Sequence, residues 1–443
     1  MKRLILAVLL SSLLFLPGCG SGGSSSITST PTSANTTINF GDATNDQVIG
    51  FEMLINSITL SGGSNPSVLP KPTEFEFVHA AGILEPLSLI SVPSGTYTGA
   101  TIGVANPEVV IMTASGPSKI PATLTASTVT VTFPSPITIG ANAAVLNFDL
   151  NLATSITLNA TNTAATVTPQ FTATTASVPA NNGGEDDEHG EMEDIRGAIT
   201  NVSSPKFTIQ PSQTAQPVTF TTNSSTQFKD GITSFSQLAN GMIVSVDAVT
   251  QTDGTLLATK VESETETANG QEVEGFVTSV TGSPATQIVV STQKSSVTST
   301  TLGTSVTVSI GNGTKFAVQS RNLSGTLPAF DATHIGKAQR VEVDSETASN
   351  NAGTATGDKI KLTEQALTGT ISALSGGNFT LTVGSTSAFA TLTGGTAVAV
   401  QTQSGTEIKN VTLSNGATVR VRGLLFVNGT AYTMVAARIV QPE

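Results

Sequence analysis

The chain has 443 residues, with 19 basic and 31 acidic side chains, a formal net charge of −12, and charged residues at only 11%. A chain this acidic does not bind nucleic acid or anionic lipid headgroups through general electrostatics. Its single cysteine excludes a disulfide within the chain, and its length favours three or four domains. The abundance of Thr, Ser, Val and Gly, with no long helical pattern, predicts an all-β protein.

The N-terminus has the layout of a secretory signal peptide. Lys2 and Arg3 precede an apolar run from Leu4 to Leu16 that only Ser11 and Ser12 interrupt. At 1.5 Å per residue this run spans about 20 Å, well short of the roughly 30 Å core of a bilayer. We therefore expect residues 1–18 to be a cleaved signal peptide and not a permanent membrane span.

The run ends in Leu16-Pro17-Gly18-Cys19, which resembles the lipobox of bacterial lipoproteins, with Pro17 in place of the usual small residue. The resemblance implies that Cys19 becomes the lipidated N-terminus of the mature protein and anchors it to the membrane. Gly20 stands where an inner-membrane retention signal usually has Asp, which favours the outer membrane. The alternative is an ordinary signal peptide followed by an incidental cysteine. Loss of Lys2 and Arg3 leaves 17 basic against 31 acidic residues, a net charge of −14.

After the cysteine, residues 19–37 are rich in Gly, Ser and Thr. We expect a flexible lipidated tether with a root-mean-square reach of roughly 20–25 Å.

Residues 38–178 show the period-2 alternation of strands that are buried on one face. Leu146, Phe148, Leu150 and Leu152 alternate with polar residues, and so do the apolar residues of the segment 129–133. This pattern predicts an antiparallel β-sandwich.

Short motifs in this region resemble an uncharacterised bacterial family numbered 4382 among the domains of unknown function. They are Gly41-Asp42-Ala43, Ile58-Thr59-Leu60 and Val92-Pro93-Ser94-Gly95-Thr96-Tyr97. The resemblance implies no activity.

Residues 179–194 form an acidic segment with seven acids in ten residues: Glu185, Asp186, Asp187, Glu188, Glu191, Glu193 and Asp194. We interpret it as a solvated, self-repelling linker. The alternative is a weak calcium site, because calcium takes six to eight oxygen ligands, although the spaced acids and turn glycine of an EF-hand loop are missing.

The rest of the chain repeats itself three times. The units open alike, with Gly197-Ala198-Ile199, Gly275-Phe276-Val277 and Gly369-Thr370-Ile371. Each then carries a Thr-x-apolar triplet: Thr226-Gln227-Phe228, Thr314-Lys315-Phe316 and Thr406-Glu407-Ile408. A turn glycine and an alternating strand follow, at Gly241, Gly336 and Gly416. We place the repeats at residues 195–264, 272–364 and 366–443.

Five or six short strands per repeat are most economically closed into a small OB-like barrel, because closure removes exposed sheet edges. The repeats resemble a secreted bacterial family numbered 5666 among the domains of unknown function. The second repeat fits least well, because it carries longer loops at 295–304 and 345–357.

The sequence predicts no catalytic residue, no metal ligand and no cofactor. His79, His189 and His334 have no companion ligands at metal spacing, and His79 is expected to cap a core face after Phe75 and Phe77. Arg420 and Arg422 could belong to a nucleic-acid groove, but in so acidic a chain a solvated strand face is the simpler interpretation.

Three functional hypotheses remain open. The first is a non-enzymatic envelope lipoprotein that binds or scaffolds envelope proteins or polysaccharide through tandem β domains. The second is a surface hydrolase that acts on an envelope or extracellular polysaccharide with a carboxylate pair, although the absence of Trp and the presence of only two Tyr count against it. The third is a purely structural spacer.

Overall fold

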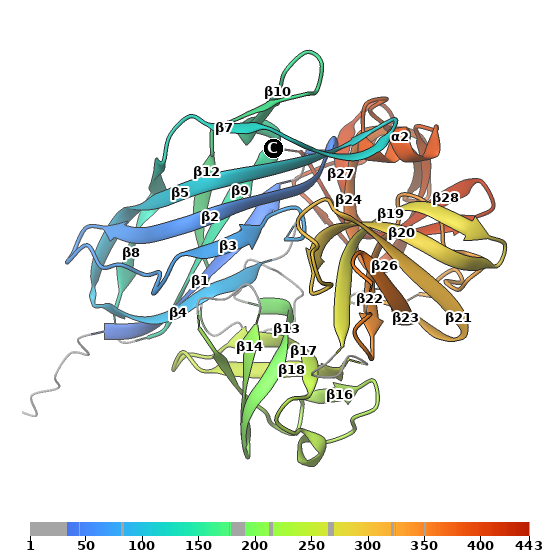
Figure 1. The fold of residues 1–443 in the computed structure, drawn as a ribbon. Coiled ribbons are helices and arrows are strands. Elements are labelled where there is room, and N and C mark those ends of the chain that lie inside the picture. The colour runs from blue at the N-terminus through green and yellow to red at the C-terminus, as the bar shows by residue number, and fades with distance from the viewer. Residues whose placement is uncertain are drawn as a thin grey trace, which may run out of the picture.

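The computed structural model describes residues 33–442 apart from 44, 81–83, 141, 177, 179–190, 212–215, 265–269, 320–322, 324 and 350. The signal peptide, the lipobox with Cys19, most of the tether and most of the acidic segment lie outside the described residues. Figure 1 shows the sandwich (blue to teal) on the left, the first repeat (green) below it, and the second and third repeats (yellow to red) on the right.

The N-terminal domain consists of two large sheets and a small one. The first sheet has the order β12-β9-β1-β4, formed by β1 (Ser33–Ala43), β4 (Glu85–Pro93), β9 (Ala144–Asn151) and β12 (Phe171–Ala176). The second has the order β3-β2-β5-β6, formed by β2 (Val48–Ser61), β3 (Thr73–Glu76), β5 (Gly95–Thr113) and β6 (Gly116–Ile120), and β8 (Thr128–Ile139) also pairs with β5. The third contains β7 (Ala122–Leu124), β10 (Ile156–Leu158) and β11 (Ala165–Val167).

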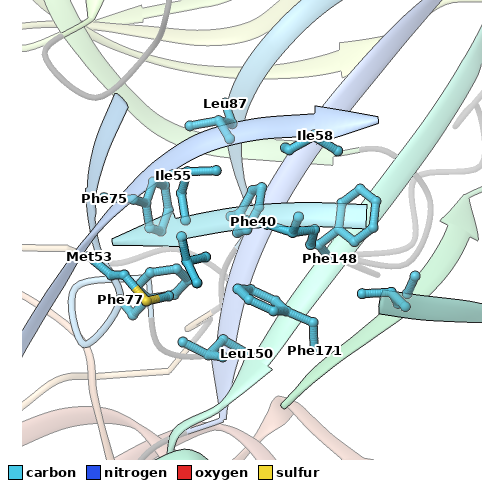
Figure 2. Packing of buried hydrophobic residues seen from close by; sticks show 14 of the residues in the cluster. Phe40, Met53, Ile55, Ile58, Phe75, Phe77, Leu87, Phe148, Leu150 and Phe171 are labelled. Carbon is cyan, nitrogen blue, oxygen red and sulfur yellow. The ribbon is translucent and has the colours of Figure 1, made fainter. Parts of the chain in front are cut away.

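Phenylalanines fill the space between the two large sheets (Figure 2). Phe40 of β1 lies 5.7 Å from Phe148 and 5.6 Å from Phe75, measured between ring centroids, and Phe75 lies 4.8 Å from Phe77. Such offset and edge-to-face pairs contribute about 0.5–1.5 kcal/mol each beyond the area that they bury. A chain without tryptophan thus builds its largest core from phenylalanine.

Three details of the sandwich differ from the sequence prediction. Strand β1 begins at Ser33, inside the expected tether, because Thr36 and Thr37 are buried between β4 and β9. Leu152 starts the short helix α1 (Leu152–Ser155), which the Asn151 side chain caps, so the expected strand ends there. The pairings β1–β9 and β7–β11 are parallel, while the others of the domain are antiparallel.

The second and third repeats are closed five-stranded barrels, as predicted. The second contains β19 (Gln271–Gly282), β20 (Ala285–Ser295), β21 (Ser305–Val318), β22 (Arg340–Ser345) and β23 (Thr354–Leu362). The third contains β24 (Gln365–Ser375), β25 (Asn378–Val383), β26 (Ala397–Lys409), β27 (Thr418–Asn428) and β28 (Ala431–Val440), with the helix α2 (Ala388–Thr393) between β25 and β26.

The first repeat has the same ring of strands with one strand broken in two. Its sheet contains β13 (Glu191–Ser203), β14 (Lys206–Pro211), β15 (Val218–Thr221), β16 (Gln227–Lys229), β17 (Ile243–Thr250) and β18 (Leu256–Ser263). Both β15 and β16 pair with β18 in parallel, as the two halves of β21 pair with β23. The pairing of β15 with β18 closes the ring. Because β13 begins at Glu191, it takes in the end of the segment expected as linker.

The threonine of each triplet holds the point where this long strand breaks or bulges. Its hydroxyl accepts a hydrogen bond from the backbone N–H three residues earlier and donates one to a carbonyl of the parallel partner strand. The accepting carbonyls belong to Ala258 for Thr226 (2.7 Å), Gly357 for Thr314 (2.6 Å) and Ala436 for Thr406 (2.6 Å). Threonine recurs here because one hydroxyl can satisfy both backbone groups that the irregularity leaves unpaired.

The opening glycine of each repeat lies where two strands approach closely. A Cβ added to Gly197, Gly275 or Gly369 would lie within 2.5 Å of a backbone oxygen of the neighbouring strand. Any side chain would therefore push the strands apart.

The predicted turn glycine occupies the same structural position in only two of the three repeats. Gly241 and Gly416 have φ values of 86° and 91°, and each backbone N–H donates to the first strand of its barrel. In the second repeat the residue that does this is Ala338, with φ 66°, and not the predicted Gly336. The sequence alignment of the repeats was therefore wrong by two residues at this point.

Candidate functional site

The densest group of buried charges in the described chain lies where the sandwich meets the first and second repeats. We call this group the ionic junction. Its twelve side chains are His79 and Glu85 from the sandwich, Arg196 and Glu264 from the first repeat, and Glu272, Glu274, Lys294, Arg340, Glu342, Asp344, Lys359 and Lys361 from the second. Six of them are basic and six are acidic.

Arg196 reaches from β13 into a ring of carboxylates. It is 8% exposed, and its guanidinium contacts Glu342 and lies 2.6 Å from the Asp344 carboxylate. Its Nε lies 3.3 Å from Glu272, and an Nη lies 3.7 Å from Glu264 of its own repeat. A planar guanidinium with five donors suits such a set of acceptors better than a lysine would.

Two lysines on β23 complete this half of the junction. Lys359 Nζ lies 3.0 Å from Glu264 Oε2, and Lys361 Nζ lies 2.9 Å from Glu342 Oε2 and 3.4 Å from Glu264 Oε1. Carboxylate oxygens of Glu264, Glu342 and Asp344 lie within 4.8 Å of one another, a spacing that a metal ion could bridge. Because Arg196 and the lysines already hold these oxygens, the donor set favours ion pairing over a metal centre.

The same cations act unequally on the three acids. Burial would raise the pKa of Glu264, but Lys361, Arg196 and Lys359 outweigh it and lower that pKa to about 2. Burial raises the pKa of Glu342 to about 8 and that of Asp344 to about 6, because each also faces neighbouring carboxylates. The protonation of these three carboxyl groups is therefore coupled, and the pKa of each depends on its position in the junction.

The second half of the junction is centred on His79. Its Nε2 contacts the Glu85 carboxylate, and its Nδ1 lies 2.8 Å from Glu274 Oε2 on β19. Arg340 of β22 lies 2.5 Å from the other oxygen of Glu274. Burial alone would lower the pKa of His79, but Glu274 and Glu85 outweigh it and raise that pKa to about 10. His79 is thus an imidazolium at neutral pH.

Amide side chains extend the junction to the sandwich backbone. Arg340 Nε donates to Gln293 Oε1 at 2.9 Å, and Gln293 Nε2 donates to the carbonyl of Ile49 in β2 at 3.1 Å. Arg340 also donates to the carbonyl of Glu364 at 2.9 Å. The second repeat is therefore held to the sandwich at strand β2 and at the turn that contains His79.

One repeat is also identified by comparison with known proteins. Residues 196–262 match the model of a domain of unknown function, DUF5666. The match confirms the predicted family for the first repeat, while the other two repeats and the resemblance of the sandwich to family 4382 stay predictions. No curated protein matches the chain. Among solved structures, drosophila Unr CSD456 is similar over 56% of this chain and 97% of its own, at 12% identity and a TM-score of 0.14, which is too low to carry an argument.

Apolar contacts hold the third repeat to the second, beside a buried hydrogen bond from Gln339 Nε2 to the Leu425 carbonyl at 2.8 Å. We call the buried set Leu323, Leu362, Leu424, Phe426, Val435 and Ala437 the apolar junction. A separate cluster joins Leu302, from the long loop predicted at 295–304, to Ile49, Val110 and Met112 of the sandwich. This loop thus serves in docking, which explains why the second repeat carries it.

A small cavity of about 50 Å³ lies where the sandwich, the second repeat and the third repeat meet. Asp46 lines it and accepts hydrogen bonds from the backbone N–H of Thr368 at 3.3 Å and, through its carbonyl, from Ala388 at 2.8 Å. Burial raises the pKa of Asp46 to about 6, although Thr368 and Arg420 favour the charged form. A cavity of this size and polarity has room for a few water molecules.

The other residues that the sequence singled out lie in different surroundings. Cys19 and His189 lie outside the described residues. His334 is partly exposed and contacts Asp331 at 2.8 Å, in keeping with a surface role. Arg420 and Arg422 do not form a solvated face: both are partly buried, and Arg422 Nε lies 3.0 Å from Glu364. They face protein carboxylates because neighbouring domains cover this strand.

The sequence did not reveal the ionic junction, because its members come from three domains and are far apart in the chain. The only available signal was acids and bases at alternate positions of strands such as 340–345 and 359–361, which also describes a solvated face. Among the described residues, no helix has the length and apolar character needed to cross a bilayer.

Proposed function

We propose that this protein is a lipid-anchored, extracytoplasmic scaffold of the cell envelope, which binds envelope proteins or polysaccharide without catalysis and presents its four β domains as one body. The observation that carries the proposal is the ionic junction. Its twelve charged side chains join three domains by contacts that only one relative arrangement satisfies. Fixed domains present their outer faces at constant spacing, which favours simultaneous weak contacts with an extended partner.

The placement of ionisable groups supports binding over hydrolysis. General acid–base catalysis needs a carboxylic acid or a histidine that reaches substrate in an accessible site. His79 and the carboxylates of the junction instead face protein cations and one another at buried domain contacts. Turnover of an envelope or extracellular glycan by the purified protein would contradict this part of the proposal.

The anchor is the part of the proposal that rests on Leu16-Pro17-Gly18-Cys19. We expect a labelled palmitate analogue to be incorporated in cells and the protein to partition into a detergent phase. Cys19→Ser should abolish both, while the matched change Ser21→Ala should leave both intact. Incorporation that survives in Cys19→Ser would refute lipidation at this residue.

The scaffold itself is tested by crosslinking in intact cells. We expect the anchored protein to capture a reproducible envelope partner, and a junction variant with loosened domains, such as Arg196→Met, to capture less of it at the same abundance. The first outcome supports binding and the second supports the fixed arrangement. Failure of the wild type to capture any partner would contradict the binding role and favour the spacer hypothesis.

A further inference from the structure

The acids of the sandwich are confined to one of its two ends. In the long strands β1, β2, β4, β5 and β9 they lie in the half of the strand nearer to the repeats, at Asp42, Glu52, Glu85, Glu108 and Asp149. The other halves belong to the segments 20–41, 53–70, 86–107 and 120–148, in which the sequence has no Asp, Glu, Lys or Arg. A chain with a net charge of −12 therefore has a sandwich with one uncharged end.

Strand pairing brings the uncharged halves together in what we call the neutral end, which consists of Ser33 and the segments 62–66, 93–96 and 134–140. Ser33 pairs with Pro93, and Gly95 pairs with Ile139. Ser94 Oγ donates to the Gly140 carbonyl at 3.3 Å and so joins the connections between the two large sheets. Figure 1 shows this end of the sandwich on the left, away from the second and third repeats.

The surface of the neutral end has hydroxyl and amide groups and proline rings. Its exposed residues include Ser33, Ser64, Asn65, Thr96, Pro134, Ser135, Pro136 and Thr138. The aromatic residues of this region, Tyr97 and Phe133, are only 0% and 5% exposed. Because protein interfaces are usually centred on exposed aromatic or arginine side chains, this surface does not suit a protein partner.

The described chain also begins at the neutral end, which limits how the molecule can lie on a membrane. Fourteen residues, 19–32, separate β1 from the end of the signal peptide and can span at most about 50 Å. The fourteen residues of β2 alone span about 46 Å along the sandwich. The opposite end of the sandwich could therefore reach the membrane only with the tether stretched almost to its limit.

Electrostatics favours the same orientation. A membrane surface with anionic lipids repels carboxylates that come within roughly 8–10 Å of it. The charged residues nearest to the neutral end are the cation Lys71, which such a surface attracts, and one acid of the first repeat, Asp253, whose carbonyl accepts from Asn35. Contact through the outer face of the sheet β3-β2-β5-β6 would instead bring Glu74 and Glu108 to the lipid.

We propose that the neutral end of the sandwich rests on the headgroup surface of the membrane that anchors the chain, with the three repeats directed away from it. The inference rests on the proposed function, because it requires lipidation at Cys19. Serine, threonine and asparagine side chains of this end would hydrogen-bond to the phosphate and carbonyl groups of the lipids. The end does not insert into the bilayer, because none of its described large apolar side chains is exposed.

The test is energy transfer from the lipidated full chain to a labelled lipid, in vesicles of phosphatidylethanolamine and phosphatidylglycerol. Ser135→Cys accepts a donor dye at the neutral end, and Thr281→Cys accepts one near the end of β19 that is farther from the ionic junction. Lipidation blocks Cys19, so each variant has one free thiol. We expect transfer from the Ser135→Cys donor to be at least about twofold more efficient, because β19 extends about 30 Å beyond Glu272.

Added charge tests whether the neutral end itself contacts the lipid. Ser64→Glu together with Thr138→Glu should lower transfer from the Ser135→Cys donor by about twofold, and high salt should restore it. The matched control is Ser225→Glu together with Ser236→Glu, two exposed serines of the first repeat, and it should leave transfer unchanged.

Equal or greater transfer from the Thr281→Cys donor would overturn the proposal, and so would transfer that does not respond to the acids at the neutral end. Vesicle flotation separates this inference from the proposed function. A chain that does not float with the vesicles has no anchor and refutes both. A chain that floats but transfers equally from the two donors keeps the proposed anchor and loses the orientation.

Discussion

The two junctions between the domains differ in how they specify an arrangement. At the apolar junction, Leu424 and Phe426 of the third repeat pack against residues such as Leu362 of the second. Apolar contact is non-directional, so it stabilises many similar arrangements. At the ionic junction, Arg196 must meet four carboxylates at once, and an unmatched charge there remains buried. The desolvation of its charges offsets much of their attraction, so the ionic junction mainly fixes orientation, whereas the apolar junction mainly supplies stability.

The largest effect is expected from breaking the ionic junction at its centre. Arg196→Met leaves Asp344 buried without its main cation and Glu342 with Lys361 alone, and it should lower the free energy of unfolding by about 5 kcal/mol, the upper end for a broken buried pair. Small-angle scattering should show a larger radius of gyration as the first repeat separates, and limited proteolysis should become faster.

The matched control is Lys260→Met in the same repeat. Lys260 pairs with Asp247 at 2.8 Å within one sheet and is 17% exposed, so its loss should cost about 1 kcal/mol and leave the radius of gyration unchanged. If both variants expanded the molecule equally, the special role of Arg196 would be refuted.

The next effect is a loss of stability at alkaline pH that comes from His79 in the ionic junction. The folded-state pKa of His79 is raised to about 10 from a usual 6.5, so its contribution is complete below pH 6.5 and falls as the pH rises through 10. At 1.36 kcal/mol per pKa unit the ceiling is about 5 kcal/mol, and we expect about 4, because Arg340 also holds Glu274.

Urea unfolding between pH 6.5 and pH 10 measures this loss. His79→Gln should remove most of the loss between pH 8 and pH 10, above the raised pKa of Glu342, whereas His334→Gln, a change at a partly exposed surface pair, should leave that loss unchanged. A wild-type profile that is flat between pH 6.5 and pH 10 would show that His79 is not a buried imidazolium.

The contrast between the junctions also marks what the sequence could predict. Alternation along single strands was enough for the barrels, because the buried positions of β27, such as Val419 and Val421, follow a local period of two. The repeated glycines and threonines were evident in the sequence, and the structure explains them. The glycines lie where two strands approach closely, and the threonines lie where a long strand breaks or bulges. The position of Ala338 was missed, because only a glycine was sought where φ is positive.

The candidate site depended on information that no single stretch contains. His79 was expected to cap a core face of the sandwich. Instead its ring contacts Glu274 and its backbone carbonyl accepts from Arg340, and both of these residues come from a repeat about 200 residues further along. Charges on strand faces look the same in sequence whether they meet water or another domain. Pairing between domains is decided by how the domains dock, and residue pattern does not encode docking.

A smaller effect is expected at the apolar junction. Leu424→Ala removes a fully buried side chain and should cost about 3 kcal/mol, with a cavity at the contact. Because the remaining apolar contacts, the Gln339 hydrogen bond to the Leu425 carbonyl and the Arg422–Glu364 pair all stay in place, the third repeat should stay docked and the radius of gyration should not change. Separation of this repeat in scattering would mean that the apolar junction also fixes orientation and would remove the distinction between the two junctions.

The smallest effect should come from a change inside one barrel, away from the centre of both junctions. Thr406→Val removes the hydroxyl that accepts from Gln403 N–H at 2.7 Å and donates to the Ala436 carbonyl at 2.6 Å. Two backbone groups lose a partner. Gln403 is partly exposed, so water can replace the hydroxyl there, but Ala436 is fully buried and its carbonyl stays unpaired, so the cost should be about 2 kcal/mol. Thr406→Ser keeps the hydroxyl and should restore most of the stability in urea unfolding, with docking unchanged in both variants. If Thr406→Val instead expanded the molecule as Arg196→Met does, the orientation of the domains would depend on the internal geometry of the barrels as well as on the charges between them.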